Sequence, residues 1–160
     1  MEQQNEIDIQ LMKRSFEELR PQDLYQILKL RSVVFVVEQV CPYLDMDDQD
    51  QTAIHLYYAV DGMPKAYVRV QAPKGYDGEH ASIGRVVVHP GFRGMGWGRR
   101  IFQEGIDYCL TAYSAPIKIS AQLYLQPFYT DFGFEPSSQV YLEDGIPHIE
   151  MVRTYKNERT

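Results

Sequence analysis

The sequence predicts an α+β protein in which a mixed, mostly antiparallel sheet of six or seven strands carries helices on both faces. Short β-branched or alternating segments occur in pairs around tight turns, as in hairpins, while longer segments carry apolar residues at helical spacing. A regular strand–helix alternation, which would favour a parallel sheet, is absent. With 160 residues, 44% of them hydrophobic, the chain suits one domain over 1–160, with its core at about 7–155.

The first elements are expected to be a strand and one long helix. Residues 7–16 partly alternate between apolar and polar side chains. Pro21 suits a first helical turn, and apolar residues then recur at helical spacing up to the β-branched run 33–37. We therefore expect one helix that frays near Glu38 and stops before Cys41-Pro42.

A hairpin and a third strand are expected next. The segments 55–60 and 65–71 flank Asp61-Gly62, a dipeptide that favours tight hairpin turns. A further strand-like segment, 82–89, leads into Pro90-Gly91. These strands supply the centre of the predicted sheet.

The second half of the chain is expected to begin with a helix from Trp97 that ends before Pro116, since apolar residues recur on one of its faces. The remaining expected elements are a strand over 117–122, a short helix seated by Pro127 and ended by Gly133, and strands over 139–142 and 148–155 around 143–147.

Composition excludes several classes of function. The net charge of −6 and the pI near 5.2 argue against non-specific binding of nucleic acid. Cys41 and Cys109 have neither metal-ligand nor redox spacing, and no apolar run reaches the length of a signal peptide core or a membrane span. We expect a soluble cytoplasmic protein with no nucleic-acid partner, no membrane partner and no metal.

An acidic segment carries Asp45, Asp47, Asp48 and Asp50. An EF-hand loop that begins at Asp45 would place Asp50 where glycine is needed and Leu56 where the bidentate glutamate belongs, so calcium binding is not supported. We expect a solvated acidic loop, which in a functional role would attract a cationic acceptor such as a primary amine.

The glycine-rich turn Arg93-Gly94-Met95-Gly96-Trp97-Gly98 is the main chemical signal of the chain. It follows a strand and opens a helix, so backbone amides and the positive end of the helix can converge on an anion, with Arg99 and Arg100 close by. A Walker loop is excluded because no Lys-Ser or Lys-Thr follows the glycines, and the last glycine interval does not fit a dinucleotide fingerprint. The turn predicts a phosphate cradle for a small cofactor.

This pattern resembles the acyl-CoA signature of the GCN5-related N-acetyltransferase (GNAT) superfamily. The resemblance rests on Arg93-x-x-Gly96-x-Gly98 after the strand Ile83–Val88, and on Phe128-Tyr129-x-x-x-Gly133-Phe134 downstream. Three further blocks resemble the ElaA-like subfamily: Arg31-x-x-Val34-Phe35-Val36-Val37-Glu38-Gln39-x-Cys41-Pro42-Tyr43, the aspartates of the acidic segment, and Glu143-Asp144-Gly145-Ile146-Pro147-His148-Ile149. Members of that subfamily commonly carry histidine where Tyr124 stands, so the resemblance supports no base at that position.

The resemblance implies acetyl-CoA as co-substrate, bound in a splay between two neighbouring strands. The amides from Arg93 to Arg99 would hold its diphosphate, and the edge of Val86–Val88 would pair with the pantetheine arm. The implied cofactor-binding residues are Val86, Val87, Val88, Arg93, Gly94, Met95, Gly96, Trp97, Gly98, Arg99, Gln122, Tyr124 and Phe128.

Direct acyl transfer to an amine requires a proton donor for the departing thiolate and a group that accepts the proton of the amine. Tyr129 matches the general-acid tyrosine of the family; its alternative role is packing among the neighbouring phenylalanines. Candidate bases are Glu38, His55 and His148, and each has a structural alternative, which for Glu38 is a charge pair with Arg31 or Arg69.

The sequence therefore predicts an acetyl-CoA-dependent N-acyltransferase, in which a homodimer is possible, acting on a small-molecule or peptide amine. Two alternatives stay open. The spacing of Arg31, Phe35, the acidic segment and Arg69 also resembles acyl-homoserine-lactone synthases, which use S-adenosylmethionine. The second alternative is a non-catalytic module that senses acyl-CoA by binding it. This alternative is supported by the lack of a carboxylate, which could act as a base, in the strand before the glycine turn.

Overall fold

A computed structural model describes residues 6–156 and contains one eight-stranded, mostly antiparallel sheet. The strand order is β1-β2-β3-β4-β5-β8-β6, and β7 pairs with the free part of β8. The strands are β1 Ile9–Ser15, β2 Ile54–Val60, β3 Met63–Gln71, β4 Ala81–Val88, β5 Ile117–Gln122, β6 Glu135–Pro136, β7 Tyr141–Glu143 and β8 Ile146–Arg153. The expected mixed α+β class is confirmed, and the two-residue strand β6 is an addition that no alternation in the sequence signalled.

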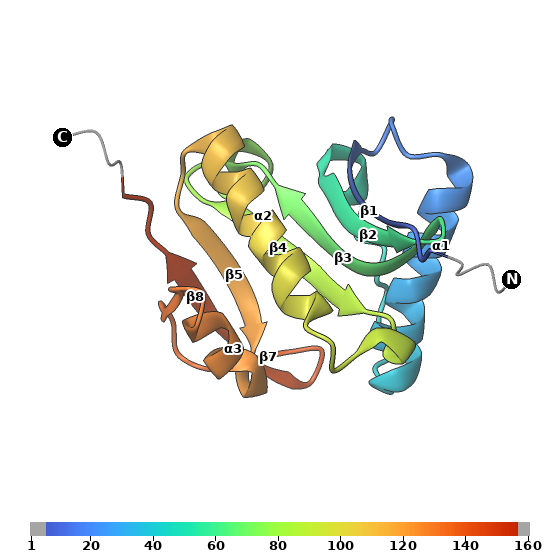
Figure 1. Cartoon of the computed structure of the whole chain (residues 1–160). Helices are drawn as coiled ribbons and strands as arrows, with labels where there is room; N and C mark the ends of the chain where they lie inside the picture. The colour runs from blue at the N-terminus through green and yellow to red at the C-terminus, as the bar shows by residue number, and fades with distance from the viewer. Residues whose placement is uncertain (1–5, 157–160) are drawn as a thin grey trace, which may run out of the picture.

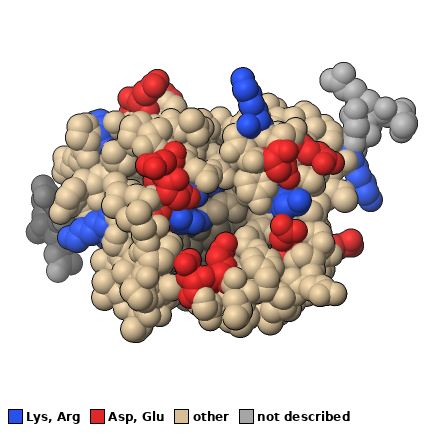
Figure 2. Space-filling view, turned by 180° about the vertical axis from the view of Figure 1, so that it is seen from behind, with Lys and Arg blue, Asp and Glu red and all other residues tan. Residues whose placement is uncertain are grey.

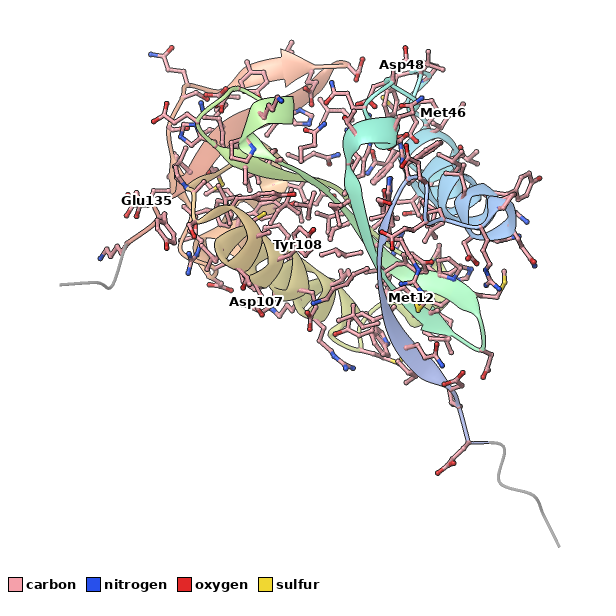
Figure 3. The ribbon with its side chains drawn as sticks, turned by 90° about the horizontal axis from the view of Figure 1, so that it is seen from above. Met12, Met46, Asp48, Asp107, Tyr108 and Glu135 are labelled. Atoms are coloured by element: carbon pink, nitrogen blue, oxygen red, sulfur yellow. The ribbon has the colours of Figure 1, made fainter. Side chains whose placement is uncertain are left out.

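Helices cover both faces of the sheet, as expected (Figures 1 and 3). The helices are α1 Pro21–Arg31, the π-helix η1 Ser32–Glu38, α2 Trp97–Tyr113 and α3 Gln126–Thr130. Short 3₁₀ segments, η2 Asp50–Thr52, η3 Pro73–Gly75, η4 Pro90–Phe92 and η5 Leu123–Leu125, connect them. Helix α1 lies against one face at β3 and β4, and α2 lies against the other face at β2, β3 and β4.

The period-two alternation of the strands divides the core between the two faces. On β3, Ala66, Val68 and Val70 pack in the cluster under α2, whereas Tyr67 packs in the cluster under α1. Because β3 is buried on both faces, its sequence is mostly apolar, and its polar residues are Lys65, Arg69 and Gln71.

The long helix expected over 21–38 continues to Glu38 but changes type at Ser32. Residues up to Arg31 are α-helical, and those from Ser32 to Glu38 form a π-helix. The change coincides with Val33-Val34-Phe35-Val36-Val37, where stiff β-branched side chains disfavour the α-helical geometry. The sequence placed the end of this helix correctly and its hydrogen-bonding pattern incorrectly.

The last hairpin is tighter than expected. Strands β7 and β8 join through Asp144-Gly145 alone, with φ of +50° and +75°, instead of through the five-residue segment 143–147. The hairpin between β2 and β3 uses the same dipeptide, Asp61-Gly62, with φ of +49° and +80°. Both residues of such a turn need positive φ, which Asp-Gly provides at little strain.

Strands β4 and β5 form a wedge-shaped opening in the sheet (Figure 1). They are parallel and pair only at Ala81 with Ile117 and at Ser82 with Lys118, after which they diverge. Strand β4 also carries one extra residue relative to β3 near Arg85, which has a φ of +53°. The edge of β4 that faces β5 is therefore unpaired beyond Ser82, which confirms the splay that the family resemblance implied.

Candidate active site

The glycine-rich turn lies at the wide end of this opening, between β4 and α2. Gly94 and Gly96 have φ of +77° and +83°, and Gly96 is the residue that caps the start of α2. Residues with a Cβ rarely adopt this left-handed conformation, so glycine at these two positions shapes the turn.

The turn presents backbone amides that have no acceptor in the protein. Within residues 6–156, the amides of Gly96, Trp97, Gly98 and Arg99 donate to no carbonyl or side chain, and the first helical bond is from the amide of Arg100 to the carbonyl oxygen of Gly96 at 3.1 Å. The first amides of every helix lack intrahelical acceptors, and here no side chain caps them. Free amides and the positive end of the helix dipole thus coincide at one site.

The arginines of this region are held by local contacts. Arg93 Nη1 lies 2.7 Å from Glu38 Oε1, and Arg99 Nη2 lies 2.9 Å from Asp131 Oδ2. The guanidinium of Arg100 lies 4.4 Å from the centre of the Trp97 ring. All three arginines are exposed, so the basic patch expected from the sequence exists within a protein of net negative charge.

A surface pocket of about 540 Å³ lies beside α3, on the other side of the opening. Its lining residues are Leu123, Tyr124, Gln126, Pro127, Thr130 and Asp131. Tyr124 is 70% exposed. The guanidinium of Arg99 lies 5.3 Å from the centre of the Phe128 ring, which connects the start of α2 to this pocket.

Tyr129 lies on α3 with its ring in the core and its hydroxyl group free. The ring contacts Phe102 and Phe128 with centroid distances of 5.1 Å. The hydroxyl oxygen makes no hydrogen bond within the described residues. Every fully buried side-chain oxygen of those residues does have a hydrogen-bond partner, so the oxygen of Tyr129 must be accessible to solvent. Burial, with a smaller contribution from Tyr124, raises the pKa of Tyr129 to about 12, which keeps the phenol protonated at neutral pH.

His55 is placed away from solvent. It is fully buried on β2; Nδ1 lies 2.7 Å from the hydroxyl oxygen of Tyr67, and Nε2 lies 2.9 Å from the carbonyl oxygen of Asp50. Burial lowers the pKa of its imidazole, which outweighs the opposite effect of Asp50. The geometry matches the structural alternative for this residue, a histidine with both nitrogens bonded inside the protein.

His148 lies at the start of β8, opposite Gln122 in the register. Nδ1 lies 2.7 Å from the carbonyl oxygen of Ile146, and Nε2 lies 3.1 Å from Glu143 Oε2. A carbonyl oxygen only accepts, so Nδ1 carries a hydrogen. His148 is therefore near the wide end of the opening, but its ring nitrogens are both engaged.

Glu38 does not lie in the apolar setting that motivated it as a base. Its side chain is 42% exposed and is paired with Arg93 of the glycine-rich turn. The alternative pairing with Arg31 or Arg69 is also wrong, because both of those arginines are bound to aspartates. Glu38 is thus located at the amide-rich turn, at the wide end of the wedge.

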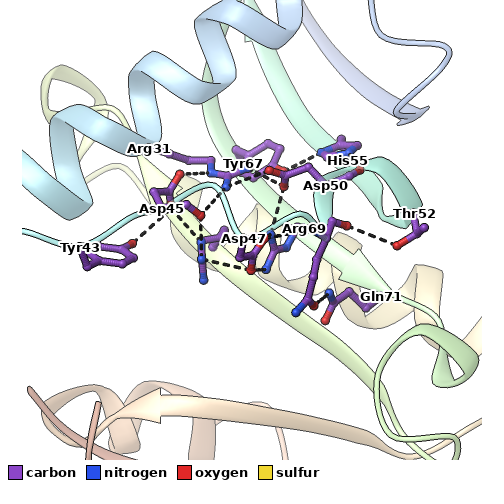
Figure 4. Close-up of polar contacts among 12 residues, drawn as sticks. Arg31, Tyr43, Asp45, Asp47, Asp50, Thr52, His55, Tyr67, Arg69 and Gln71 are labelled. Atoms are coloured by element: carbon purple, nitrogen blue, oxygen red, sulfur yellow. Dashed lines mark hydrogen bonds and ion pairs between the residues drawn. The ribbon is translucent and has the colours of Figure 1, made fainter. Parts of the chain in front are cut away.

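The acidic segment is not a solvated loop (Figure 4). Arg31, which has no exposed surface, donates from Nε to Asp45 Oδ2 at 2.8 Å and from Nη1 to Asp50 Oδ1 at 2.8 Å. Asp45 and Asp50 are themselves buried. Burying ionised carboxylates is unfavourable unless a charged partner bonds them, which the sequence pattern alone could not reveal.

Two more arginines complete this buried network. Arg69 bonds Asp47 at 2.8 Å and Asp50 at 3.0 Å, and Arg85 bonds Asp45 at 2.8 Å and Asp47 at 3.3 Å. Three arginines thus balance three aspartates, Asp45, Asp47 and Asp50. Asp45, Asp47 and Asp50 therefore carry no unbalanced charge with which to attract a cationic acceptor. Of the four aspartates of the segment, only Asp48 is exposed.

The face of the sheet opposite α2 is hollowed at its centre, with acidic and basic side chains around the hollow (Figure 2). Sequence reasoning did not identify the polar residues that β5, β7 and β8 contribute to this face. They are Lys118, Ser120, Tyr141 and Glu150. The period-two alternation of β5 and β8 could have placed these residues together on one face of the sheet. It could not have shown that this face lies next to the opening between β4 and β5.

Among residues 6–156, no group of three or more histidine, cysteine, aspartate or glutamate side chains is arranged to hold a metal ion. In the same part of the chain, no helix is long and apolar enough to cross a membrane.

Comparison with known proteins agrees with this geometry. The family model described as an acetyltransferase (GNAT) domain matches residues 33–155. Protein ElaA of Escherichia coli (strain K12) is 41% identical over 139 residues, which cover 85% of this chain and 90% of that protein. A UPF0039 protein of Schizosaccharomyces pombe is 37% identical over 147 residues, 90% of this chain and 96% of its own.

Solved structures give the same result. The crystal structure of an acyl-CoA N-acyltransferase from Pseudomonas aeruginosa has a TM-score of 0.87 at 37% identity and covers 92% of this chain and 100% of its own. Escherichia coli ElaA has a TM-score of 0.84 at 38% identity, covering 91% and 99%. A CoA-dependent acyl-homoserine lactone synthase, 14% identical with a TM-score of 0.75, shares the fold. The chain belongs to the GNAT acetyltransferase family and, within it, to the ElaA-like group.

Proposed function

We propose that this GNAT-family acyltransferase transfers an acetyl group from acetyl-CoA directly to an amine. The observation that carries the proposal is the row of unbonded amides at the start of α2, adjacent to an unpaired edge of β4. A diphosphate and an amide-bearing arm are the chemical partners of such a pair of features.

The chain has a suitable group for each part of the cofactor. The amides from Arg93 to Arg99 would bind the diphosphate, with the glycines allowing its close approach. The edge of β4 at Val86–Val88 would exchange backbone hydrogen bonds with the pantetheine arm. Gln122, Tyr124 and Phe128, at the end of β5 and around the pocket of α3, would line the opposite side.

Tyr129 would serve as the proton donor. As the amine nitrogen bonds to the thioester carbon, the carbon–sulfur bond breaks, and the departing thiolate needs a proton. Its free hydroxyl and raised pKa keep the phenol available in the protonated form. The amine releases its proton to water or to a carboxylate, so proton uptake and release balance.

The placement of the base candidates favours different roles for them. His55 is enclosed in the core, and both nitrogens of His148 are bonded. For Glu38 we propose that its carboxylate partly neutralises Arg93 beside the diphosphate site, because the 2.7 Å contact links these two residues directly.

The two alternatives predict different products. A sensor would bind acyl-CoA and release no CoA when amines are added, and a lactone synthase would consume S-adenosylmethionine. The lactone-synthase alternative stays open because Arg31 and Arg69, both buried, occupy positions on which the resemblance to those synthases rests. Both cysteines, Cys41 and Cys109, are free and buried.

The test is a thermal-unfolding series with CoA, acetyl-CoA and pantetheine. A ligand that binds only the folded state stabilises it by about 2.7 kcal/mol at a concentration one hundred times its Kd. CoA and acetyl-CoA should raise Tm, and pantetheine, which lacks the diphosphate, should raise it much less. Equal shifts would count against the amide cradle, and no shift at millimolar CoA would count against the function; a panel of amines assayed for CoA release then identifies acceptors.

A further inference from the structure

A polar strip crosses the face of the sheet opposite α2, at the wedge between β4 and β5. Ile119 and Met151 belong to the core under α2, so their neighbours in sequence, Ser120 and Glu150, project from the other face. Ser120 and Glu150 are directly opposite each other in the antiparallel register, and the Ser120 hydroxyl is hydrogen bonded to the Tyr141 hydroxyl.

Glu150 is the unmatched charge of this strip. Its side chain is half-buried and has no hydrogen bond or ion pair with any residue from 6 to 156. The basic side chains on the surrounding elements already have partners. Lys118 lies 3.6 Å from Asp77, Arg85 lies 2.8 Å from Asp45, and the His148 ring lies 3.1 Å from Glu143. A half-buried carboxylate without a partner is unfavourable and favours binding of a cation.

Aromatic side chains lie near this carboxylate. Burial raises the pKa values of Tyr76 and Tyr141, and the negative charge of Glu150 is a further contribution at both residues. Tyr76 is 39% exposed, so part of it faces solvent. A half-buried carboxylate beside the hydroxyl groups of Ser120 and Tyr141 is chemically suited to an ammonium group, which forms a charge-assisted hydrogen bond with the carboxylate.

The position of the strip relates it to the proposed reaction. The last pair that joins β4 and β5, Ser82 with Lys118, is two residues before Ser120, so the strip begins where the sheet opens. Helix α2 covers the opposite face, whereas this face is hollowed (Figure 2). Ser120, Tyr141 and Glu150 lie on this face, close to the point at which β4 and β5 diverge.

We infer that the acceptor is a primary aliphatic amine and that Glu150, together with Ser120 and Tyr141, binds it in its ammonium form. The bound ammonium group releases one proton to solvent before its nitrogen attacks the thioester carbon. The inference deepens the proposed function and rests on it. In this inference a cationic acceptor is attracted by Glu150 on β8, on the far side of the wedge, and not by Asp45, Asp47 and Asp50, whose charges are neutralised.

The test measures binding of a charged probe and an uncharged probe to the CoA-bound protein. Nα-acetyl-lysine amide is titrated against Nα-acetyl-norleucine amide, which has a similar side-chain stem without the ammonium group, while backbone amide resonances are followed by NMR. We expect the lysine probe to shift resonances of residues 118–122 and 148–152, and the norleucine probe to leave them unchanged. Equal effects of the two probes, or none on these strands, would overturn the inference without any variant.

Glu150→Gln then tests the residue itself, with Glu135→Gln as the matched control. Glu135 lies on β6, is exposed and points outward at the edge of the sheet (Figure 3). Losing a hydrogen bond to a charged group should weaken the lysine probe about tenfold or more in Glu150→Gln, with CoA affinity unchanged and no effect in Glu135→Gln. Unchanged affinity for the lysine probe in Glu150→Gln would contradict the role of Glu150. Failure of CoA itself to bind would instead overturn the proposed function, so the two failures are distinguishable.

Discussion

Arg31 offers a quantitative test of the buried charge network. The side chain has no exposed surface and bonds two aspartates, each at 2.8 Å. Burial alone would lower the pKa of its guanidinium, but Asp50, Tyr67 and Asp45 more than offset this effect and raise it above its ordinary value. Removing one partner of a buried ion pair typically costs about 3–5 kcal/mol, because the other partner is left buried with an uncompensated charge.

We therefore expect Arg31→Met to lower the free energy of unfolding by about 3 kcal/mol or more. The value should lie towards the lower end of the range, because Asp50 keeps Arg69 and Asp45 keeps Arg85. For a domain of this size, a loss of about 3 kcal/mol corresponds to a Tm lower by roughly 6–12 °C. Urea unfolding followed by circular dichroism measures the free energy, and a thermal scan measures Tm.

Arg20→Met is the matched control for this prediction. Arg20 also bonds an aspartate, Asp23, at 2.8 Å and directly precedes the same helix, but its side chain is 74% exposed. Exposed ion pairs contribute little because water already solvates both charges. Similar losses for Arg31→Met and Arg20→Met would refute the reasoning, since burial would then not determine the cost.

Two further predictions concern the catalytic site. Tyr129→Phe should lower the rate of acetyl transfer by about 10²-fold or more while leaving CoA affinity nearly unchanged, because it removes a proton donor and keeps the packed ring. Steady-state kinetics and a direct measurement of CoA binding check this prediction. An unchanged kcat would exclude Tyr129 as the acid. Glu38→Gln should strengthen acetyl-CoA binding without a loss of kcat, since it removes a negative charge beside the diphosphate site and frees Arg93. A large fall in kcat with unchanged KM would instead support Glu38 as the base.

Local sequence patterns predicted most of the elements because their causes are local. Asp-Gly produced both hairpin turns that join paired strands, and glycines produced the left-handed positions of the amide-rich turn. The apolar face of the helix from Trp97 is buried as its spacing indicated. The π-helix from Ser32 is an intermediate case, since the β-branched run indicated an irregularity but not its type.

The partners of charged residues were not predictable in the same way. The segment Asp45–Asp50 looks solvated in sequence, because acidic residues close together are usually exposed. The structure buries Asp45 and Asp50 because Arg31, Arg69 and Arg85, from three separate elements, converge on them. Glu38 likewise meets Arg93, which is 55 positions later in the chain.

The sequence by itself determined the α+β class, the order of the elements and the position of the glycine-rich turn, since these follow from periodicity and from the backbone preferences of glycine and aspartate. Only the tertiary structure decided which edge of β4 is free, which charges neutralise each other and that the half-buried carboxylate of Glu150 has no partner among residues 6–156. The physical reason is that ion pairing and strand pairing join residues distant in the chain, and their energies depend on burial that no local pattern specifies.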